Sequence, residues 1–137
     1  MTVLSQPATL LTFDPITTAV SALTSTPVSL GRVEVLAINA DFAYGSGGTT
    51  VKAWVQTSLD GGVTWMDIAN FAFTTAAARR AYNLTNVAVT AIATPVDGTL
   101  ADNTSVNGFL GTMFRVKYTT TGTYAGATSL KITAVPG

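Results

Sequence analysis

The segment of residues 58–65, with the sequence SLDGGVTW, constrains the fold more than any other part of the chain. It separates two stretches with strand-like patterns, residues 50–57 and residues 66–74. Two such stretches joined by a short Asp-Gly-Gly segment are typical of a β-hairpin, because glycine adopts positive φ without a steric cost. The sequence therefore predicts an antiparallel pair of strands over residues 50–74.

Five side chains of this segment are expected to shape the turn. The Asp60 carboxylate can accept backbone N–H groups of its own turn, Ser58 and Thr64 can bind the turn through their hydroxyls, and Trp65 supplies an apolar body at the base. Together with Gly62 they fit the pattern Ser-x-Asp-x-Gly-x-Thr-Trp, so the segment resembles an Asp-box. In sialidase-type propellers the Asp-box recurs once per blade and lies away from the catalytic centre. The resemblance implies a structural hairpin and no catalytic role.

Strand-like segments separated by turn signals recur every ~10–15 residues along the rest of the chain, which is typical of an all-β sandwich or barrel. We expect a single β-sandwich domain over residues 1–137, of jelly-roll type, with about seven to nine strands. One Asp-box without an internal repeat excludes a propeller. Residues 1–7 are expected to form a loose arm, either frayed or docked on a neighbouring subunit.

Four segments allow more specific predictions. Residues 28–44 form the longest strand-like run, and its nearly continuous apolar centre indicates burial on both faces or a place at the centre of a sandwich. Residues 75–80 fit one helical turn or an extended connector, and residues 82–94 return to a strand pattern. Residues 95–107 form a long polar loop, and loops of this length tend to be functional or to make contacts.

The composition limits the possible functions. Charged residues make up 10% of the chain, seven acidic and seven basic residues cancel, and threonine occurs 25 times. Without a basic field, binding to nucleic acid is disfavoured. No apolar stretch approaches the ~18 residues of a membrane span, and no signal peptide is visible. A surface poor in charge and rich in threonine is more typical of proteins that pack into assemblies.

The sequence does not single out a catalytic or metal site. There is no histidine and no cysteine, which removes Ser-His-Asp and Cys-His catalysis. A pair of carboxylates would need Glu34, the sole glutamate, which falls in a run that is expected to be buried. Asp97, Asp102 and Asn103 could offer oxygen ligands to calcium, but turn chemistry explains the same residues. We expect no enzyme activity, no metal and no cofactor.

Two further features have a structural and a functional interpretation. Trp54 or Trp65 could stack on a sugar, whereas a tryptophan in the core or at the hairpin base is the commoner case. Arg79 and Arg80 could pair with acidic groups of a partner, or could belong to a solvated connector.

The chain resembles small structural proteins of tailed bacteriophages in three segments, residues 56–65, 98–103 and 114–126. The resemblance implies a component of the virion, and among such components a head decoration protein fits the size and fold best. It further implies the major capsid protein or other virion proteins as partners, and homo-oligomers with the trimer favoured, while charge and hydropathy predict no contact with nucleic acid or membrane. The alternatives are a carbohydrate-binding module on the capsid or tail, and a tail or head-completion component.

Overall fold

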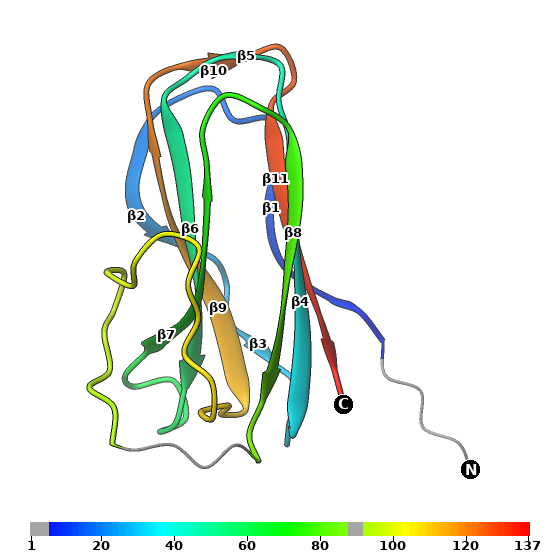
Figure 1. Ribbon diagram of the computed structural model, residues 1–137, viewed down its shortest axis with the longest axis vertical. Helices are drawn as coiled ribbons and strands as arrows, with labels where there is room; N and C mark the ends of the chain where they lie inside the picture. Colours follow the sequence, from blue (N-terminus) through cyan, green and yellow to red (C-terminus); the bar gives the residue numbers. More distant parts are fainter. Residues whose placement is uncertain (1–5, 88–91) are drawn as a thin grey trace.

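The structure is a computed structural model that describes residues 6–87 and 92–137, and this part of the chain is built from β-strands (Figure 1). No helix that could span a membrane occurs among these residues. Eleven strands are present: β1 (Ala8–Phe13), β2 (Val20–Thr24), β3 (Val28–Ser29), β4 (Val35–Ala43), β5 (Ser46–Gly47), β6 (Thr50–Ser58), β7 (Met66–Phe73), β8 (Ala78–Thr85), β9 (Met113–Thr121), β10 (Tyr124–Ala125) and β11 (Ser129–Pro136).

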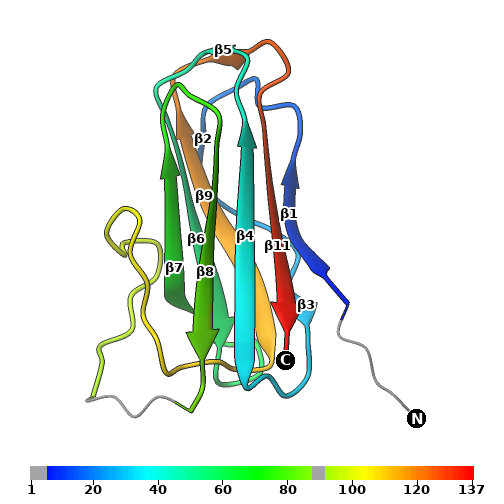
Figure 2. The same cartoon turned by 45° about the vertical axis from the view of Figure 1, so that its right-hand side comes forward.

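The strands form two antiparallel sheets that face each other (Figure 2). The first sheet has the order β1-β11-β4-β8, and the second has the order β2-β9-β6-β7, with β3 also paired to β9. A short ribbon of β10 and β5 closes one end. The chain passes back and forth between the two sheets. The resulting orders of four strands, β1-β11-β4-β8 and β2-β9-β6-β7, are those of a jelly roll. The predicted all-β sandwich of jelly-roll type is confirmed.

The strand count is slightly higher than the predicted seven to nine, because β3, β5 and β10 have two residues each. Residues 75–80 contain no helical turn, and their last three residues begin β8. β8 ends at Thr85, so the strand expected over residues 82–94 is shorter than predicted, and residues 88–91 lie outside the described part of the chain. Of the proposed arm, residues 1–5 also lie outside it, and Gln6 and Pro7 are exposed.

Of the two interpretations of residues 28–44, burial of the centre on both faces is wrong. Burial alternates along β4, where Leu36 and Ile38 are buried whereas Val35 and Ala37 are exposed. β4 lies between β11 and β8, but nothing in the described chain packs on its outward side, and small residues such as alanine tolerate this exposure. The apolar run therefore marks a central strand of a sheet with one open face.

The core between the sheets is built from the inward rows of both. At one end it is aromatic: the rings of Phe42 and Phe73 stack with centroids 4.9 Å apart, and Tyr124 meets Phe42 edge-on at 6.1 Å. The buried Tyr124 hydroxyl donates to the carbonyl of Thr74 at 2.7 Å, which satisfies its polar end. This end of the core joins β4 of the first sheet to β7 of the second.

The long polar loop covers the part of the second sheet's outward side that β6 and β7 form. It runs beside β7, where it is the yellow loop of Figure 1. Its backbone alternates hydrogen bonds with the edge of β7: Asp67 N donates to Val96 O at 2.8 Å and Asn70 N to Thr104 O at 2.9 Å. We call residues 95–107 the covering segment. The two sheets consequently differ, since the first has an open outward face and the second has a partly covered one.

Candidate functional site

The Asp-box hairpin is held by side chains that bond within their own turn. The Asp60 carboxylate accepts the backbone N–H of Thr64 at 2.8 Å, the Thr64 hydroxyl at 2.6 Å and the Ser58 hydroxyl at 2.8 Å. The Ser58 hydroxyl in turn accepts the N–H of Gly62 at 2.8 Å. Gly61 and Gly62 have φ of +73° and +97°, values at which a side chain would strain the turn.

These bonds stabilise the charged form of Asp60. The hydroxyl of Thr64 contributes most, followed by the Thr64 amide and the Ser58 hydroxyl, and together they lower the pKa of Asp60 to about 2. The carboxylate therefore stays ionised throughout the neutral range. Because its oxygens are occupied by the turn, this arrangement serves to fix the hairpin.

Trp65 lies at the base of the hairpin beside a charged neighbour. The guanidinium of Arg115 sits over the indole ring, 4.4 Å from the ring centroid, which is the geometry of a cation–π contact. The half-buried ring also lines a small hollow of about 110 Å³ together with Leu59 and Pro95. One side of the ring is thus occupied by Arg115 and is closed to a sugar.

Asp67 attaches the covering segment to the second sheet. Its side chain is buried, and its two oxygens accept the consecutive backbone N–H groups of Gly98, Thr99 and Leu100 at 2.8 to 3.0 Å. It also accepts the side-chain amide of Gln56 at 2.8 Å. The hydrogen bonds that the Asp67 carboxylate accepts thus come from amide N–H groups and not from a cationic side chain.

Gln56 extends this contact into a network across three strands. Its amide nitrogen also donates to Asp97 at 2.6 Å, and its carbonyl oxygen accepts from Arg115 Nε at 2.8 Å. Asp97 is paired with Lys117 at 2.7 Å. Burial acts to raise the pKa of Asp97, but the hydrogen bonds from Lys117 and Gln56 outweigh it and hold the pKa below its ordinary value. Each charged side chain of the network is thus paired with an opposite charge or a hydrogen-bonding group, which is typical of a structural contact.

Trp54 lies under the covering segment. Its ring is 9% exposed, and its indole N–H donates to the carbonyl of Leu100 at 2.9 Å. A ring with so little free surface does not offer a face on which a sugar could stack. Trp54 acts here as the apolar support on which the covering segment rests.

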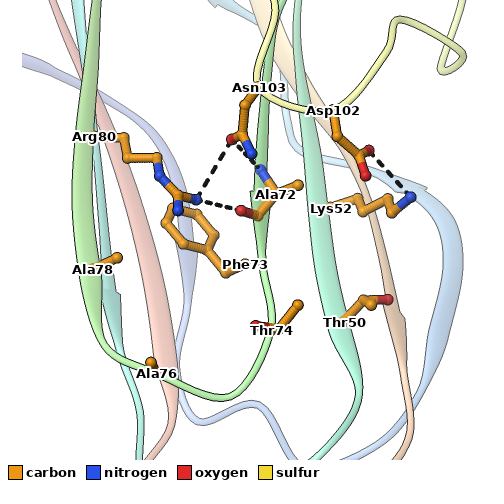
Figure 3. Close-up of a pocket in the computed structure, with 10 residues that line it drawn as sticks. All are labelled: Thr50, Lys52, Ala72, Phe73, Thr74, Ala76, Ala78, Arg80, Asp102 and Asn103. Atoms are coloured by element: carbon orange, nitrogen blue, oxygen red, sulfur yellow. Dashed lines mark hydrogen bonds and ion pairs between the residues drawn. The ribbon is translucent and has the colours of Figure 1, made fainter.

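A hollow of about 280 Å³ opens beside the covering segment, between the edges of β7 and β8 (Figure 3). Arg80 extends over the ring of Phe73, with 4.9 Å between the guanidinium carbon and the ring centroid. Its Nη1 donates to the carbonyl of Ala72 and lies 3.4 Å from the side-chain oxygen of Asn103. On the other side of the hollow Lys52 pairs with Asp102 at 3.1 Å.

The structure distributes the sequence-predicted residues over separate places. Ser58, Asp60, Gly62 and Thr64 meet in one turn, with Trp65 at its base, whereas Trp54 lies under the covering segment and bonds to Leu100. Glu34 is exposed and pairs with Arg32 at 3.5 Å, so it is not the buried carboxylate that its position suggested.

The three oxygen donors considered for calcium are used elsewhere. Asp97 binds Lys117, Asp102 binds Lys52, and the side-chain oxygen of Asn103 accepts the N–H of Ala72 at 3.0 Å. Among the described residues, no group of three or more acidic, histidine or cysteine side chains could hold a metal ion.

Sequence reasoning missed Gln56 and Asp67, and it did not place Arg80 beside the ring of Phe73. Gln56 and Asp67 stand opposite each other in the register of β6 and β7, at a shift of the pairing, and both are buried. No local signal marks this pair, because both strands carry other polar residues and the backbone amides that Asp67 binds begin 31 residues later in the sequence, at Gly98. Arg80 pairs with Ala40 and so belongs to the core-facing row of β8, which no charge pattern indicates.

Comparison with known proteins adds no relative: no protein-family model, no curated protein and no solved structure matches the chain.

Proposed function

We propose that the protein is a non-enzymatic structural protein of a tailed-bacteriophage virion, which decorates the capsid and stabilises it by bridging capsid subunits. The observation that carries this proposal is the gathering of exposed apolar side chains at one end of the sandwich. The resemblance of three sequence segments to small phage structural proteins points in the same direction, and jelly-roll domains are common in viral shells.

The apolar end is the end at which β4 begins and β11 finishes. These two positions are paired, with Leu36 opposite Pro136, and Figure 2 shows the β6–β7 hairpin at the same end. The loop after β8 also lies at this end, where Asn86 N donates a hydrogen bond to Glu34 O at 2.7 Å. Five of the seven exposed large apolar side chains of the described residues belong to these segments: Val35, Leu59, Val63, Val87 and Val135.

Single exposed apolar side chains are ordinary on a protein surface, but several at one end mark a place of interaction. Leu59 and Val63 are 59% and 79% exposed although the hairpin that carries them is rigidly bonded. The rigid turn therefore presents apolar groups to the outside at a small cost in conformational entropy on binding. Because charged residues make up only 10% of the chain and their charges cancel, we expect the contact with the capsid to depend little on salt.

The absence of histidine and cysteine and the structural use of the buried carboxylate support a role without catalysis. The partly covered second sheet leaves the first sheet as the broad open face. We propose that copies associate there or along the edges, with a trimer as the favoured assembly on the lattice.

The test compares particles assembled with and without this gene. Particles that carry the protein should release their genome at a higher temperature, and a map of the particle by electron microscopy should place the chain on the head, bridging neighbouring capsid subunits. Equal heat resistance of both particles, or density for the chain on the tail, would refute the proposal.

Matched variants test the apolar end itself. The double substitution Leu59→Ser with Val63→Ser should abolish binding to particles that lack the protein, measured by co-sedimentation. Leu23→Ser is the control, because Leu23 is 46% exposed but belongs to β2, where it pairs with Tyr118 near the middle of β9. If the control binds as poorly as the double variant, or if both bind normally, the apolar end is not the contact.

A further inference from the structure

The hollow between β7 and β8 combines groups that suit one kind of small ligand. Its floor and lower wall are apolar, from Ala76, Ala78 and Phe73, and hydrogen-bonding side chains surround them (Figure 3). These polar groups include donors and acceptors as well as hydroxyls: Thr50, Lys52, Thr74, Arg80, Asp102 and Asn103. Alternating donors and acceptors around an apolar floor suit a ring with several hydroxyl groups.

Arg80 is held in place before any ligand arrives. Its guanidinium lies over the Phe73 ring, and its Nη1 is bound to the carbonyl of Ala72. Among the described residues, its Nε and Nη2 make no hydrogen bond, so two donors of the planar fork are unused. A guanidinium fork fits a carboxylate with two parallel hydrogen bonds, and an immobilised fork loses less entropy when it binds.

The charge balance of the hollow favours an anion. Arg80 and Lys52 contribute two positive charges, and Asp102 contributes one negative charge that is already paired with Lys52 at 3.1 Å. Both partners of this pair are partly exposed, so the pair is weak and can share its hydrogen bonds with a ligand. The remaining positive charge is that of Arg80.

The size of the hollow limits the ligand to a single ring. Its volume of about 280 Å³ lies just below the range of about 300–1,000 Å³ that is usual for small-molecule sites. We propose that the hollow binds a sugar acid of the hexuronate type, either free or as a unit of an acidic polysaccharide. The carboxylate binds the fork of Arg80, the hydroxyls bind Asp102, Asn103 and Lys52, and the C–H face of the ring rests on the alanines.

This site is separate from the apolar end, and the inference does not depend on a role in the capsid. It also differs from stacking on Trp54, whose ring is covered. Polysaccharide and free sugar acid share the chemistry of recognition, and the experiment below separates them.

The experiment is a titration of the isotope-labelled protein with glucuronate, followed by backbone amide shifts, with glucose as the neutral probe. Shifts should be confined to the residues around the hollow, and glucuronate should bind about tenfold more tightly than glucose, as expected for one charge-assisted contact. A short oligo-glucuronate should bind more tightly still if the natural ligand is a polysaccharide, and equally if it is the free sugar acid.

Two arginine variants make the test specific. Arg80→Gln should remove the preference for glucuronate, whereas Arg79→Gln should keep it, because Arg79 bonds to Asn39 on the open face of the first sheet. The spectrum of each variant away from the hollow serves as the check on folding. If Arg80→Gln is misfolded, Arg80→Lys takes its place in the test and should bind glucuronate with an affinity between that for glucose and that of the wild type. Equal affinity for glucose and glucuronate, shifts outside the hollow, or an unchanged preference in Arg80→Gln would overturn the proposal.

Discussion

Replacement of Asp67 by alanine tests how the covering segment is held. The carboxylate is 1% exposed and accepts three backbone N–H groups of the segment and one side-chain amide. Each buried donor left without an acceptor costs about 1–3 kcal/mol, so three amides add up to about 3–9 kcal/mol.

Two effects reduce this sum. The substitution removes the cost of burying a charge, which amounts to several kcal/mol. The segment can also lift from the sheet so that water reaches its amides. We therefore expect Asp67→Ala to lower the free energy of unfolding by about 2–4 kcal/mol, which corresponds to a fall of roughly 10 °C in Tm for a domain of this size.

The assay is urea and thermal unfolding followed by circular dichroism, with tryptophan fluorescence as a second probe of Trp54 under the segment. Asp41→Ala is the matched control, because Asp41 is an exposed aspartate on the open face of β4. If Asp67→Ala unfolds within about 1 °C of the wild type, or no lower than Asp41→Ala, the carboxylate does not hold the segment and the reasoning fails.

Three further substitutions test other contacts. The pKa of Asp60 falls from 3.8 to about 2 on folding. The ionised carboxylate therefore stabilises the fold fully above pH 3.8, and this stabilisation is lost as the pH drops toward about 2. The difference in Tm between wild type and Asp60→Asn should shrink over the same pH range. Trp54→Phe removes the bond to Leu100 and should cost about 1 kcal/mol in urea unfolding, and an unchanged midpoint would contradict this bond. Gly111→Ala would place a Cβ 1.9 Å from the carbonyl oxygen of Ser58 and should cost about 1–3 kcal/mol or more, whereas a normal Tm would show that the backbone can shift.

The hairpin was the part of the fold most accessible from the sequence. Strands β6 and β7 lie within one residue of the ranges expected from the pattern, because their alternation and the Gly-Gly turn are local signals. The same holds for β9 and β11, for which alternation in the sequence predicts strands over residues 112–120 and 128–135.

Pairings between distant strands could not be obtained in this way. That β1 pairs with β11, or that β4 has one bare face, depends on the order of strands across a whole sheet, and alternation in one strand does not contain it. The apolar run of β4 fits burial on both faces as well as a central strand with one open face, because exposed alanines and valines look the same in the sequence as buried ones.

The candidate sites depend even more on distant contacts. The turn formed by Ser58, Asp60 and Thr64 is local and could be described from eight residues. The hollow is not local, since Lys52, Arg80 and Asp102 come from three segments whose neighbourhood is set by the sandwich and by the covering segment. Charge and spacing along the chain give no sign of it.

The position of β11 also bears on how the chain can fold as it is made. β11 follows all other strands in the described chain, yet it lies between β1 and β4, with Ala134 opposite both Ala8 and Ile38. The first sheet therefore cannot be completed until residues 129–136 have left the ribosome. Until then, the edge of β4 that pairs with β11 stays without its hydrogen-bonding partner. The second sheet is complete once β9 has emerged, so it is the natural early scaffold of biosynthesis, and the first sheet closes over it as the last event.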